Sequence, residues 1–334
     1  MDKLAVITSG GDAPGMNAAI RAVVRKALYE GVKVFGVKRG YAGVIDGDFI
    51  ELTNNSVSDI ISKGGTFLRS ARCNEFRTAV GRKKAAKKLR SKGIENLVVI
   101  GGDGSFTGAK LLSEETGINT IGVPATIDDD IACTDDSIGY DTALNTIIGA
   151  INNIRDTASS HERAFVIETM GRHAGFLALA AGLAGGAESI LIPERKVDVD
   201  EVCRKIQHDY EEGKIHSIIL VAEGVELAGK EFKTNRDLDE SPAFTLSKEI
   251  SKRTEFEARV TILGHIQRGG APTGRDRLLA SRLGAAAVDK LLAGESNVMV
   301  GLVNNKVQSS PIREAIEQEK GIDMDLYNLS TILS

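Results

Sequence analysis

The sequence predicts an α/β protein in which mainly parallel sheets are covered by helices. A short apolar strand, a glycine-rich turn and an Ala- and Leu-rich helix follow one another in four segments, at 4–28, 96–112, 164–184 and 260–292. The apolar runs are continuous rather than alternating, which indicates strands buried on both faces. There are 36 glycines and only 4% aromatic residues, so we expect aliphatic cores and closely approached turns.

The elements follow from this pattern in chain order. Residues 4–8 are expected to form the first strand. This run of five residues, four of them apolar, is followed by a glycine turn and is too short for a signal peptide or a membrane span. Connecting helices are expected at about 81–92, 142–154 and 200–211. The polar segment 226–249 has the least pattern and is expected to be a surface excursion. Ligands of such folds bind at the carboxyl ends of strands, where the glycine turns fall.

Length and charge exclude several classes of protein. A chain of 334 residues with 42% hydrophobic residues can fill the cores of two domains. The net charge of -4, with cations and acids intermixed, does not favour binding to nucleic acid or to an anionic membrane. Cys73, Cys133 and Cys203 form no CxxC pair, which argues against a disulfide framework and a zinc site and fits a reducing cytoplasm.

The glycine turns can hold phosphate, because the backbone N–H groups at a helix start are unpaired and no Cβ blocks their approach. An ordinary strand-to-helix turn is the alternative for any one of them. The turn at 10–15 has Walker spacing, but Met16 and Asn17 replace the required Lys and Ser or Thr. The segment 101–108 does not match GxGxxG either, so positive charge must come from elsewhere in the chain.

Arginines beside these turns and strand ends can supply that charge, since a guanidinium binds two phosphate oxygens at once. A single arginine is more often a solvated surface residue. The chain has five at such places: Arg72, Arg163, Arg172, Arg259 and Arg268.

The acidic stretch "PATIDDD" offers the carboxylates that such a site needs. Extended backbone after Pro124 is expected to place Thr126, Asp128 and Asp130 on one face and Asp129 on the other. One carboxylate can lie near Mg²⁺, with Asp103 as a further metal acid, while another accepts a hydroxyl proton. A Ca²⁺ loop or a solvated acidic turn is the alternative, but no EF-hand pattern follows. Phosphate turns and carboxylates together predict phosphoryl transfer.

Three histidines, His161, His173 and His265, lie near the proposed phosphate arginines. Their spacing lacks the pattern of metal ligands, so we expect them to donate or accept hydrogen bonds to substrate or within the core.

Eight motifs, taken in order over nearly the whole chain, carry a resemblance to a known family. They are ITSGGDAPGMNAAIRA, GGTFLRSAR, VVIGGDGS, PATIDDDI, IRDTASSHERAFVIETMGRHAG, GAESILIPE, VAEG and LGHIQRGGAPT. Together they resemble the bacterial ATP-dependent 6-phosphofructokinases. GGDGS alone would be weak, because other kinases have similar sequences, whereas the combination is specific.

The resemblance implies transfer of the ATP γ-phosphoryl group to the 1-hydroxyl of fructose 6-phosphate, with Mg²⁺, in a cytoplasmic homotetramer. It implies two similar doubly wound, Rossmann-like domains. The ATP- and Mg²⁺-binding domain would comprise 1–139 and about 266–316, and the fructose 6-phosphate-binding domain 140–265 and about 317–334. No nucleic acid or membrane partner is implied.

The resemblance also assigns roles to individual residues. Asp128 would be the general base, with Thr126, Arg72 and Arg172 assisting transfer and with Asp103 and Asp130 at the metal. The ATP contacts would be Gly11, Arg72, Cys73, Gly102, Asp103, Gly104 and Ser105. The sugar-phosphate contacts would be Thr126, Asp128, Arg163, Met170, Gly171, Arg172, Glu223, Arg259, His265 and Arg268. Of these, Arg163 and Arg259 would come from a neighbouring subunit. The effector contacts would be Arg21, Arg25, Arg155, Glu188 and Lys214.

Departures from the family pattern bear on turnover and regulation. Ala125 stands where the family usually has Gly, and Asp129 where it usually has Asn. Asn54 and Glu212 occupy positions that are commonly cationic at the effector site. We therefore expect weak or absent regulation by ADP or phosphoenolpyruvate. A sigmoidal dependence of the rate on fructose 6-phosphate that ADP makes hyperbolic would contradict this expectation.

Two alternatives to the ATP-dependent enzyme stay open from the sequence. Pyrophosphate-using relatives tend to carry Asp and Lys at the positions of Gly104 and Ala125, so small residues there favour ATP. A sugar-phosphate sensor that has lost catalysis is the other alternative, although it would not need Asp103, Asp128 and Asp130. The sequence does not exclude a related ketose phosphate, such as tagatose 6-phosphate, as substrate.

Overall fold

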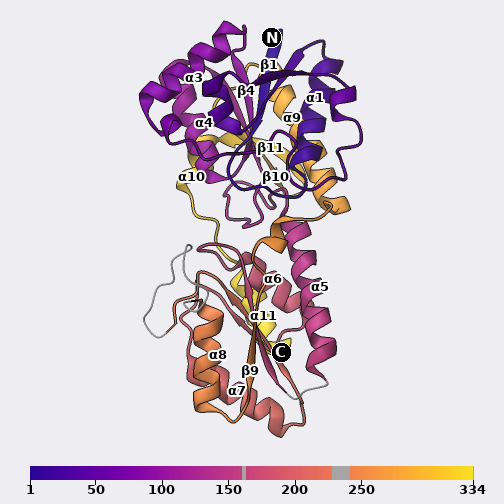
Figure 1. Cartoon of the computed structure of the whole chain (residues 1–334), viewed down its shortest axis with the longest axis vertical. Coiled ribbons are helices and arrows are strands. Elements are labelled where there is room, and N and C mark those ends of the chain that lie inside the picture. Colours follow the sequence, from indigo (N-terminus) through magenta and orange to yellow (C-terminus); the bar gives the residue numbers. More distant parts are fainter. Residues whose placement is uncertain (160–162, 228–240, 334) are drawn as a thin grey trace. The chain divides into compact units, whose positions relative to one another are not determined.

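The computed structural model describes residues 1–159, 163–227 and 241–333. It divides the chain into two compact units, each built around its own sheet (Figure 1). Unit 1 comprises Met1–Thr142 and Arg268–Lys320, and unit 2 comprises Ala143–Gln267 and Gly321–Ser334. The chain therefore passes between the units three times.

Unit 1 is built on a seven-stranded sheet within the described residues. In sheet order its strands are β11 (Lys306–Pro311), β10 (Val298–Val303), β5 (Asn119–Pro124), β4 (Asn96–Gly101), β1 (Lys3–Thr8), β2 (Lys33–Val37) and β3 (Phe49–Leu52). The edge strands β3 and β11 are antiparallel to their neighbours, and the strands between them are parallel. The central strands are almost wholly buried, as their continuous apolar runs predict.

Helices cover both faces of this sheet. They are α1 (Met16–Tyr29), α2 (Gly40–Asp46), α3 (Ala79–Ser91), α4 (Asp103–Thr116), α9 (Gly274–Leu292) and α10 (Ile312–Glu317), with short 3₁₀ turns η1 (Asn55–Val57) and η2 (Glu75–Arg77). In Figure 1, α3 and α4 lie on one side of the sheet and α1 and α9 on the other. The core between them is mostly aliphatic, with Phe106 fully buried.

Unit 2 has a four-stranded parallel sheet among the residues that the structure describes. Its order is β7 (Ser189–Leu191), β8 (Ser217–Ala222), β6 (Ala164–Thr169) and β9 (Ala258–Ile262). Its helices are α5 (Tyr140–Ala158), which begins in unit 1, α6 (Phe176–Gly185), α7 (Val199–Glu211), α8 (Pro242–Arg253) and α11 (Met324–Leu333), with the 3₁₀ turn η4 (Gly264–Arg268). The predicted α/β class with mainly parallel sheets is confirmed.

The expected helices near 81–92, 142–154 and 200–211 are confirmed as α3, α5 and α7. The expectation of a surface excursion over 226–249 is wrong for its last part, because α8 begins at Pro242. Residues 228–240 lie outside the described residues. The helix start has local signals, since Ser241 accepts a hydrogen bond from the Phe244 amide and proline occupies the first helical position.

Candidate active site

The first glycine turn joins β1 to α1. Gly10 and Gly15 have positive φ angles of 84° and 107°, which a residue with a Cβ rarely adopts. A Cβ added to Gly11 would lie 2.7 Å from Nη1 of Arg268, and that nitrogen donates to the Asp12 carbonyl at 3.2 Å. The Arg268 guanidinium therefore lies directly against the turn, in the space that the missing side chain leaves.

The second turn joins β4 to α4 and lies beside the first. A Cβ at Gly101 would lie 2.5 Å from the Ser9 carbonyl and 2.6 Å from Oγ of Ser105. No atom lies within 4 Å of a Cβ added at Gly104, so one face of the helix start is open. Asp103 stands in the first turn of α4, where the helix dipole favours a carboxylate.

The acidic stretch does not continue β5, and the expected extended alternation through Asp130 is wrong. The strand ends at Pro124, and Asp129 takes a left-handed φ of 55°. The Asp128 amide donates to the Thr126 hydroxyl at 3.2 Å, which closes a local turn that competes with strand geometry. Aspartate tolerates the left-handed region better than most residues, because its short polar side chain bonds locally.

Asp128 is fully buried and lies close to both a hydroxyl and a cation. The Thr126 hydroxyl is 3.3 Å from its Oδ2, and Nη2 of Arg268 is 3.9 Å from its Oδ1. Arg268 thus lies between the first glycine turn and the candidate base. The sequence predicts Arg268 as one of five arginines beside the glycine turns, and the family resemblance assigns it to the sugar phosphate.

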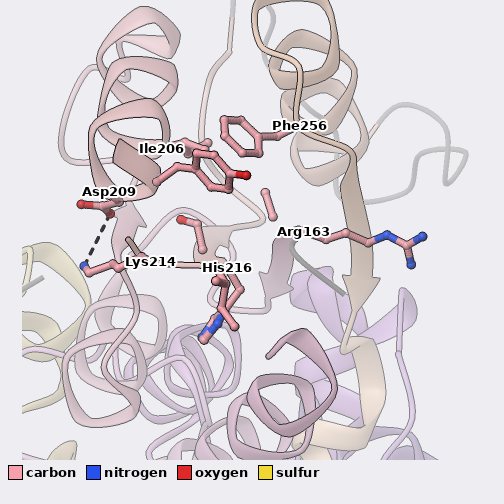
Figure 2. A pocket seen from close by; sticks show the side chains of 10 residues that line it. Arg163, Ile206, Asp209, Lys214, His216 and Phe256 are labelled. Carbon is pink, nitrogen blue, oxygen red and sulfur yellow. Dashed lines mark ion pairs between the residues drawn. The ribbon is translucent and has the colours of Figure 1, made fainter. Parts of the chain in front are cut away.

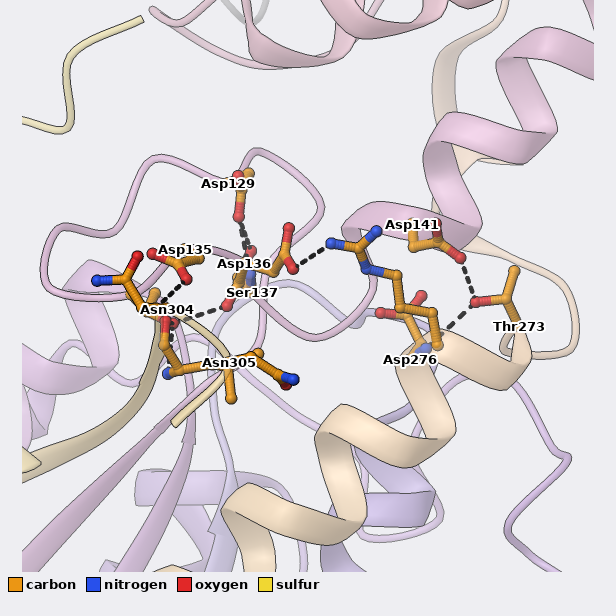
Figure 3. A network of polar contacts seen from close by, with 12 residues as sticks. Asp129, Asp135, Asp136, Ser137, Asp141, Thr273, Asp276, Asn304 and Asn305 are labelled. Carbon is orange, nitrogen blue, oxygen red and sulfur yellow. Dashed lines mark hydrogen bonds and ion pairs between the residues drawn. The ribbon is translucent and has the colours of Figure 1, made fainter. Parts of the chain in front are cut away.

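Asp129 is also buried but is bonded to different groups. Its Oδ2 accepts from Nζ of Lys320 at 2.7 Å. Its Oδ1 accepts from the amide of Ser137 at 2.7 Å, and Figure 3 shows these two residues facing each other. Burial raises the pKa of Asp129 to about 6, while Lys320 and Ser137 oppose the rise. Asp130, the third acid, is half-buried.

Arg72 is exposed and Cys73 half-buried, on a loop that is tied to the first glycine turn. The Ser70 hydroxyl donates to the Gly10 carbonyl at 2.7 Å, and Asn17 of α1 donates to the Lys63 and Gly64 carbonyls at 3.1 Å. Asn17 stands where a P-loop has Ser or Thr, and here it holds this loop against α1.

In unit 2 the expected sugar-phosphate residues follow β6 and β8, which are adjacent parallel strands. The Arg172 amide donates to Oε1 of Glu223 at 2.9 Å, and a Cβ on Gly224 would lie 2.2 Å from the Arg172 carbonyl. Gly171 and Arg172 have φ angles of 137° and 54°. The structure therefore brings these segments into contact through a backbone geometry that holds Arg172 in a rarely adopted conformation.

Three further sugar-phosphate candidates lie around β9. Arg163 and Arg259 both pair with Glu257, at 2.8 and 2.5 Å, and Arg259 is more than half exposed. His265 is exposed in η4. His161 lies outside the described residues.

The expected effector residues are distributed over both units. Arg21 and Arg25 lie on α1, while Arg155 is 3.7 Å from Glu188, and Glu188 accepts from the Ile218 amide at 2.7 Å. Lys214 lies 3.6 Å from Asp209 beside a small pocket that His216 also lines (Figure 2). The pocket has a volume of about 10 Å³, room for about one water molecule and not for a nucleotide.

Sequence reasoning missed several buried polar residues that support these loops. Asp276 of α9 accepts from the amides of Gly139 and Thr142 at 2.8 Å and so caps α5. Gln267, fully buried, accepts from the Met170 amide at 3.2 Å. Lys320 is 191 residues from its partner Asp129. No sequence signal links residues so far apart, because these pairings arise only on folding.

Fold and site together define an α/β protein whose glycine turns, arginine and carboxylates meet at the carboxyl ends of parallel strands, as in phosphoryl-transfer proteins. The sequence profile described as Phosphofructokinase matches residues 3–291. The chain belongs to the phosphofructokinase family.

Relatives and solved structures agree with this. The chain is 62% identical to an ATP-dependent 6-phosphofructokinase of Halothermothrix orenii and 57% identical to one of Halalkalibacterium halodurans, each match covering both chains completely. It resembles phosphofructokinase from Saccharomyces cerevisiae with a TM-score of 0.86 and 37% identity, over 100% of this chain and 47% of that one. A pyrophosphate-dependent phosphofructokinase from Marinobacter aquaeolei shares the fold at 23% identity, with a TM-score of 0.83.

Among the described residues, no helix is long and apolar enough to cross a membrane.

Proposed function

We propose that this chain is an ATP-dependent 6-phosphofructokinase, which phosphorylates the 1-hydroxyl of fructose 6-phosphate to give fructose 1,6-bisphosphate and ADP, a step of glycolysis. The observation that carries the proposal is Asp128, a fully buried carboxylate that lies beside the Thr126 hydroxyl and within 3.9 Å of Arg268 at the glycine turns. The full-length relatives named ATP-dependent 6-phosphofructokinase support it.

In this mechanism Asp128 accepts the proton of the 1-hydroxyl as the new O–P bond forms. The bond between the γ-phosphorus and the bridging oxygen breaks, and ADP leaves with the electron pair. Arg268, Arg72 and Arg172 would offset the charge on the transferring group, and the Thr126 hydroxyl would orient it. Protein groups need to position the reactants rather than bond to them covalently.

Mg²⁺ fits the acids present, although no three His, Cys, Asp or Glu side chains of the described residues form a cluster that would hold a metal by itself. Mg²⁺ in phosphoryl-transfer sites commonly takes one or two carboxylates and completes its shell with phosphate oxygens and water. Asp103 and Asp130 would be those carboxylates, since each follows the end of one of the adjacent strands β4 and β5. The ion would neutralise phosphate charge during transfer.

The nucleotide is assigned to unit 1 and the sugar phosphate chiefly to unit 2. The ATP contacts proposed are Gly11, Arg72, Cys73, Gly102, Asp103, Gly104 and Ser105. Gly104 supports ATP rather than pyrophosphate as the donor. The space beside Gly104 is open, so ATP can occupy it, whereas an acidic side chain at this position would fill that space and repel the phosphates. The sugar-phosphate residues Met170, Gly171, Arg172, Glu223 and His265 are proposed from the motifs and from their place after β6, β8 and β9.

The oligomer and its regulation are proposed on the same basis. The proposed oligomer is a homotetramer in which Arg163 and Arg259 reach the site of a neighbouring subunit. Among the ion pairs described, each of these arginines pairs only with Glu257, which is compatible with that role. Three further points stay predictions. They are the cytoplasmic location, the weak regulation expected from Asn54 and Glu212, and the effector contacts of Arg21, Arg25, Arg155, Glu188 and Lys214.

The proposal is tested by measuring fructose 1,6-bisphosphate formation from fructose 6-phosphate and Mg²⁺, with ATP and pyrophosphate in parallel. Asp128→Asn should lower kcat by about 10²- to 10⁴-fold, the usual contribution of a general base. Asp136→Asn is the control, because that acid lies on the same loop but pairs with the exposed Arg275. Turnover with pyrophosphate alone would favour the other donor class. Sugar-phosphate binding without turnover would favour the sensor.

A further inference from the structure

The middle carboxylate of the acidic stretch, on Asp129, is bonded at both oxygens and only 4% exposed. Lys320 donates to its Oδ2 at 2.7 Å, and the Ser137 amide donates to its Oδ1 at 2.7 Å. The Ser137 hydroxyl lies 2.9 Å from the same Oδ1 and 2.8 Å from the Thr126 carbonyl, so its single proton serves one of the two. This set of contacts encloses the backbone that carries Asp128.

The backbone at Asp129 explains why these contacts matter for its neighbour. Its φ of 55° turns the chain sharply between Asp128 and Asp130. Aspartate adopts this region more readily than most residues, and here the bonds from Lys320 and Ser137 fix its side chain in that conformation. Release of the Asp129 side chain would therefore let the turn relax and would change where the Asp128 carboxylate points.

Lys320 binds the loop that carries Asp129 but lies far from it in the sequence. Besides Asp129, its ammonium donates to the Asp135 carbonyl at 2.8 Å, so one cation joins the two ends of the segment 129–135. Lys320 is only 17% exposed and is the last residue of unit 1 before the chain passes to unit 2. An ion pair so withdrawn from water is weakly screened, and removing one partner leaves the other charge buried and uncompensated.

We propose that Asp129 and Lys320 are positioning residues whose ion pair fixes the turn that aims Asp128 and compensates the additional carboxylate beside it. This inference rests on the proposed function of Asp128. It accounts for three consecutive acids, because one would serve transfer, one the metal, and the middle one would be neutralised locally by Lys320. Asparagine at 129 would present an amide N–H₂ or a single oxygen to the ammonium, so an acid suits this lysine better.

The test compares Lys320→Gln, Lys320→Arg and the double variant Asp129→Asn/Lys320→Gln with the wild-type enzyme. Lys290→Gln is the matched control, because Lys290 forms an ion pair of 2.9 Å with Glu295 in which the side chains are 31% and 35% exposed, more than those of Lys320 and Asp129. We expect Lys320→Gln to lower kcat at least tenfold, with the KM for ATP within threefold of wild type. Lys320→Arg and the double variant should lie within about threefold of the wild-type kcat, and Lys290→Gln within twofold.

Recovery in the double variant is expected because the substituted side chains at positions 129 and 320 are both neutral and can still hydrogen-bond to each other, so that a contact across the turn is kept without an uncompensated charge. A merely structural role for Lys320 would give no such recovery. A Lys320→Gln kcat within twofold of wild type would overturn the inference, as would a folded double variant no more active than Lys320→Gln. If Lys320→Gln does not fold, a folded and active double variant supports the inference and a folded inactive one refutes it. An inactive wild-type protein would instead refute the proposed function, and this inference with it.

Discussion

Asp128 and Asp129 are neighbours in the chain, yet folding gives their carboxylates different partners. Asp128 faces the Thr126 hydroxyl and the Arg268 guanidinium, whereas Asp129 faces Lys320 and Ser137. The left-handed backbone at Asp129 separates the two directions. Both oxygens of Asp129 are already engaged by Lys320 and Ser137, which supports Asp128 rather than Asp129 as the proposed base.

Burial of Asp129 predicts how stability depends on pH. Its pKa in the folded protein, about 6, exceeds the ordinary value of 3.8, so the folded state binds this proton more tightly than the unfolded state does. Its contribution to stability is fully present below about pH 4 and is lost as the pH rises through 6. The shift corresponds to about 3 kcal/mol. The measurement is the free energy of unfolding of wild type and of Asp129→Asn by urea denaturation. The value for wild type minus the value for the variant should fall by up to about 3 kcal/mol between pH 4 and pH 7.

A difference that is constant from pH 4 to 7 would show that the pKa of Asp129 is not raised.

A second prediction at the scale of single residues concerns the contact between Gly11 and Arg268. The nearest atoms to an added Cβ are the flexible end of Arg268, so Gly11→Ala should fold normally while displacing the guanidinium from the turn and from Asp128. We expect kcat/KM for fructose 6-phosphate to fall about tenfold, which corresponds to the loss of one charge-assisted contact, with little change in melting temperature. Gly274→Ala is the control, because nothing lies within 4 Å of its added Cβ. Equal activity of the two variants would contradict the role given to Arg268.

At the scale of elements, the site depends on how strands end and helices begin. Glycine turns after β1 and β4 lead into α1 and α4, and the acidic stretch follows β5, which is parallel to both strands in the same sheet. Parallel strands deliver all of these connections to one edge, which is why residues near 11, 103 and 128 can serve a common ligand.

The start of α5 depends on a side chain from another helix. Asp276 is 1% exposed and accepts from two amides at the start of α5 and from the Thr142 hydroxyl. Asp276→Ala would leave these buried donors without an acceptor and should lower the free energy of unfolding by about 3 kcal/mol, measured by urea denaturation. Asp289→Ala on the same helix, where the acid is 55% exposed, should change it by less than about 1 kcal/mol. Similar losses for both would mean that the cap contributes little.

At the scale of the whole molecule, the proposed sharing of sites between subunits can be tested by complementation. Asp128→Asn and Arg163→Ala enzymes should each be nearly inactive, whereas subunit exchange between them should regenerate sites with an intact Asp128 and a neighbour's intact Arg163. The mixture should therefore exceed the summed activities of the two parents in a coupled assay.

The matched control mixes Asp128→Asn with Thr126→Val. Both residues lie on one loop of one subunit, so no exchange can restore an intact site. Recovery in this control, or none in the first mixture, would count against Arg163 acting across a subunit boundary.

Much of the fold was predictable because its signals are local. Continuous apolar strands, glycine turns and helical periodicity identify β1, β4 and their following helices without knowledge of the rest of the chain. The missed start of α8 also had a local signal, the Ser-Pro pair at 241 and 242, but polar neighbours masked it.

The sequence by itself determined the α/β class, the family resemblance and the residues of the glycine turns and acidic stretch, since all of these are properties of contiguous segments. Only the tertiary structure decided that Arg268 lies against Gly11 and Asp128, that Lys320 neutralises Asp129, and that Asp276 caps α5. The physical reason is that a buried charge takes its partner from whichever segment packs beside it. Packing joins residues more than a hundred positions apart, which no periodicity in the sequence records.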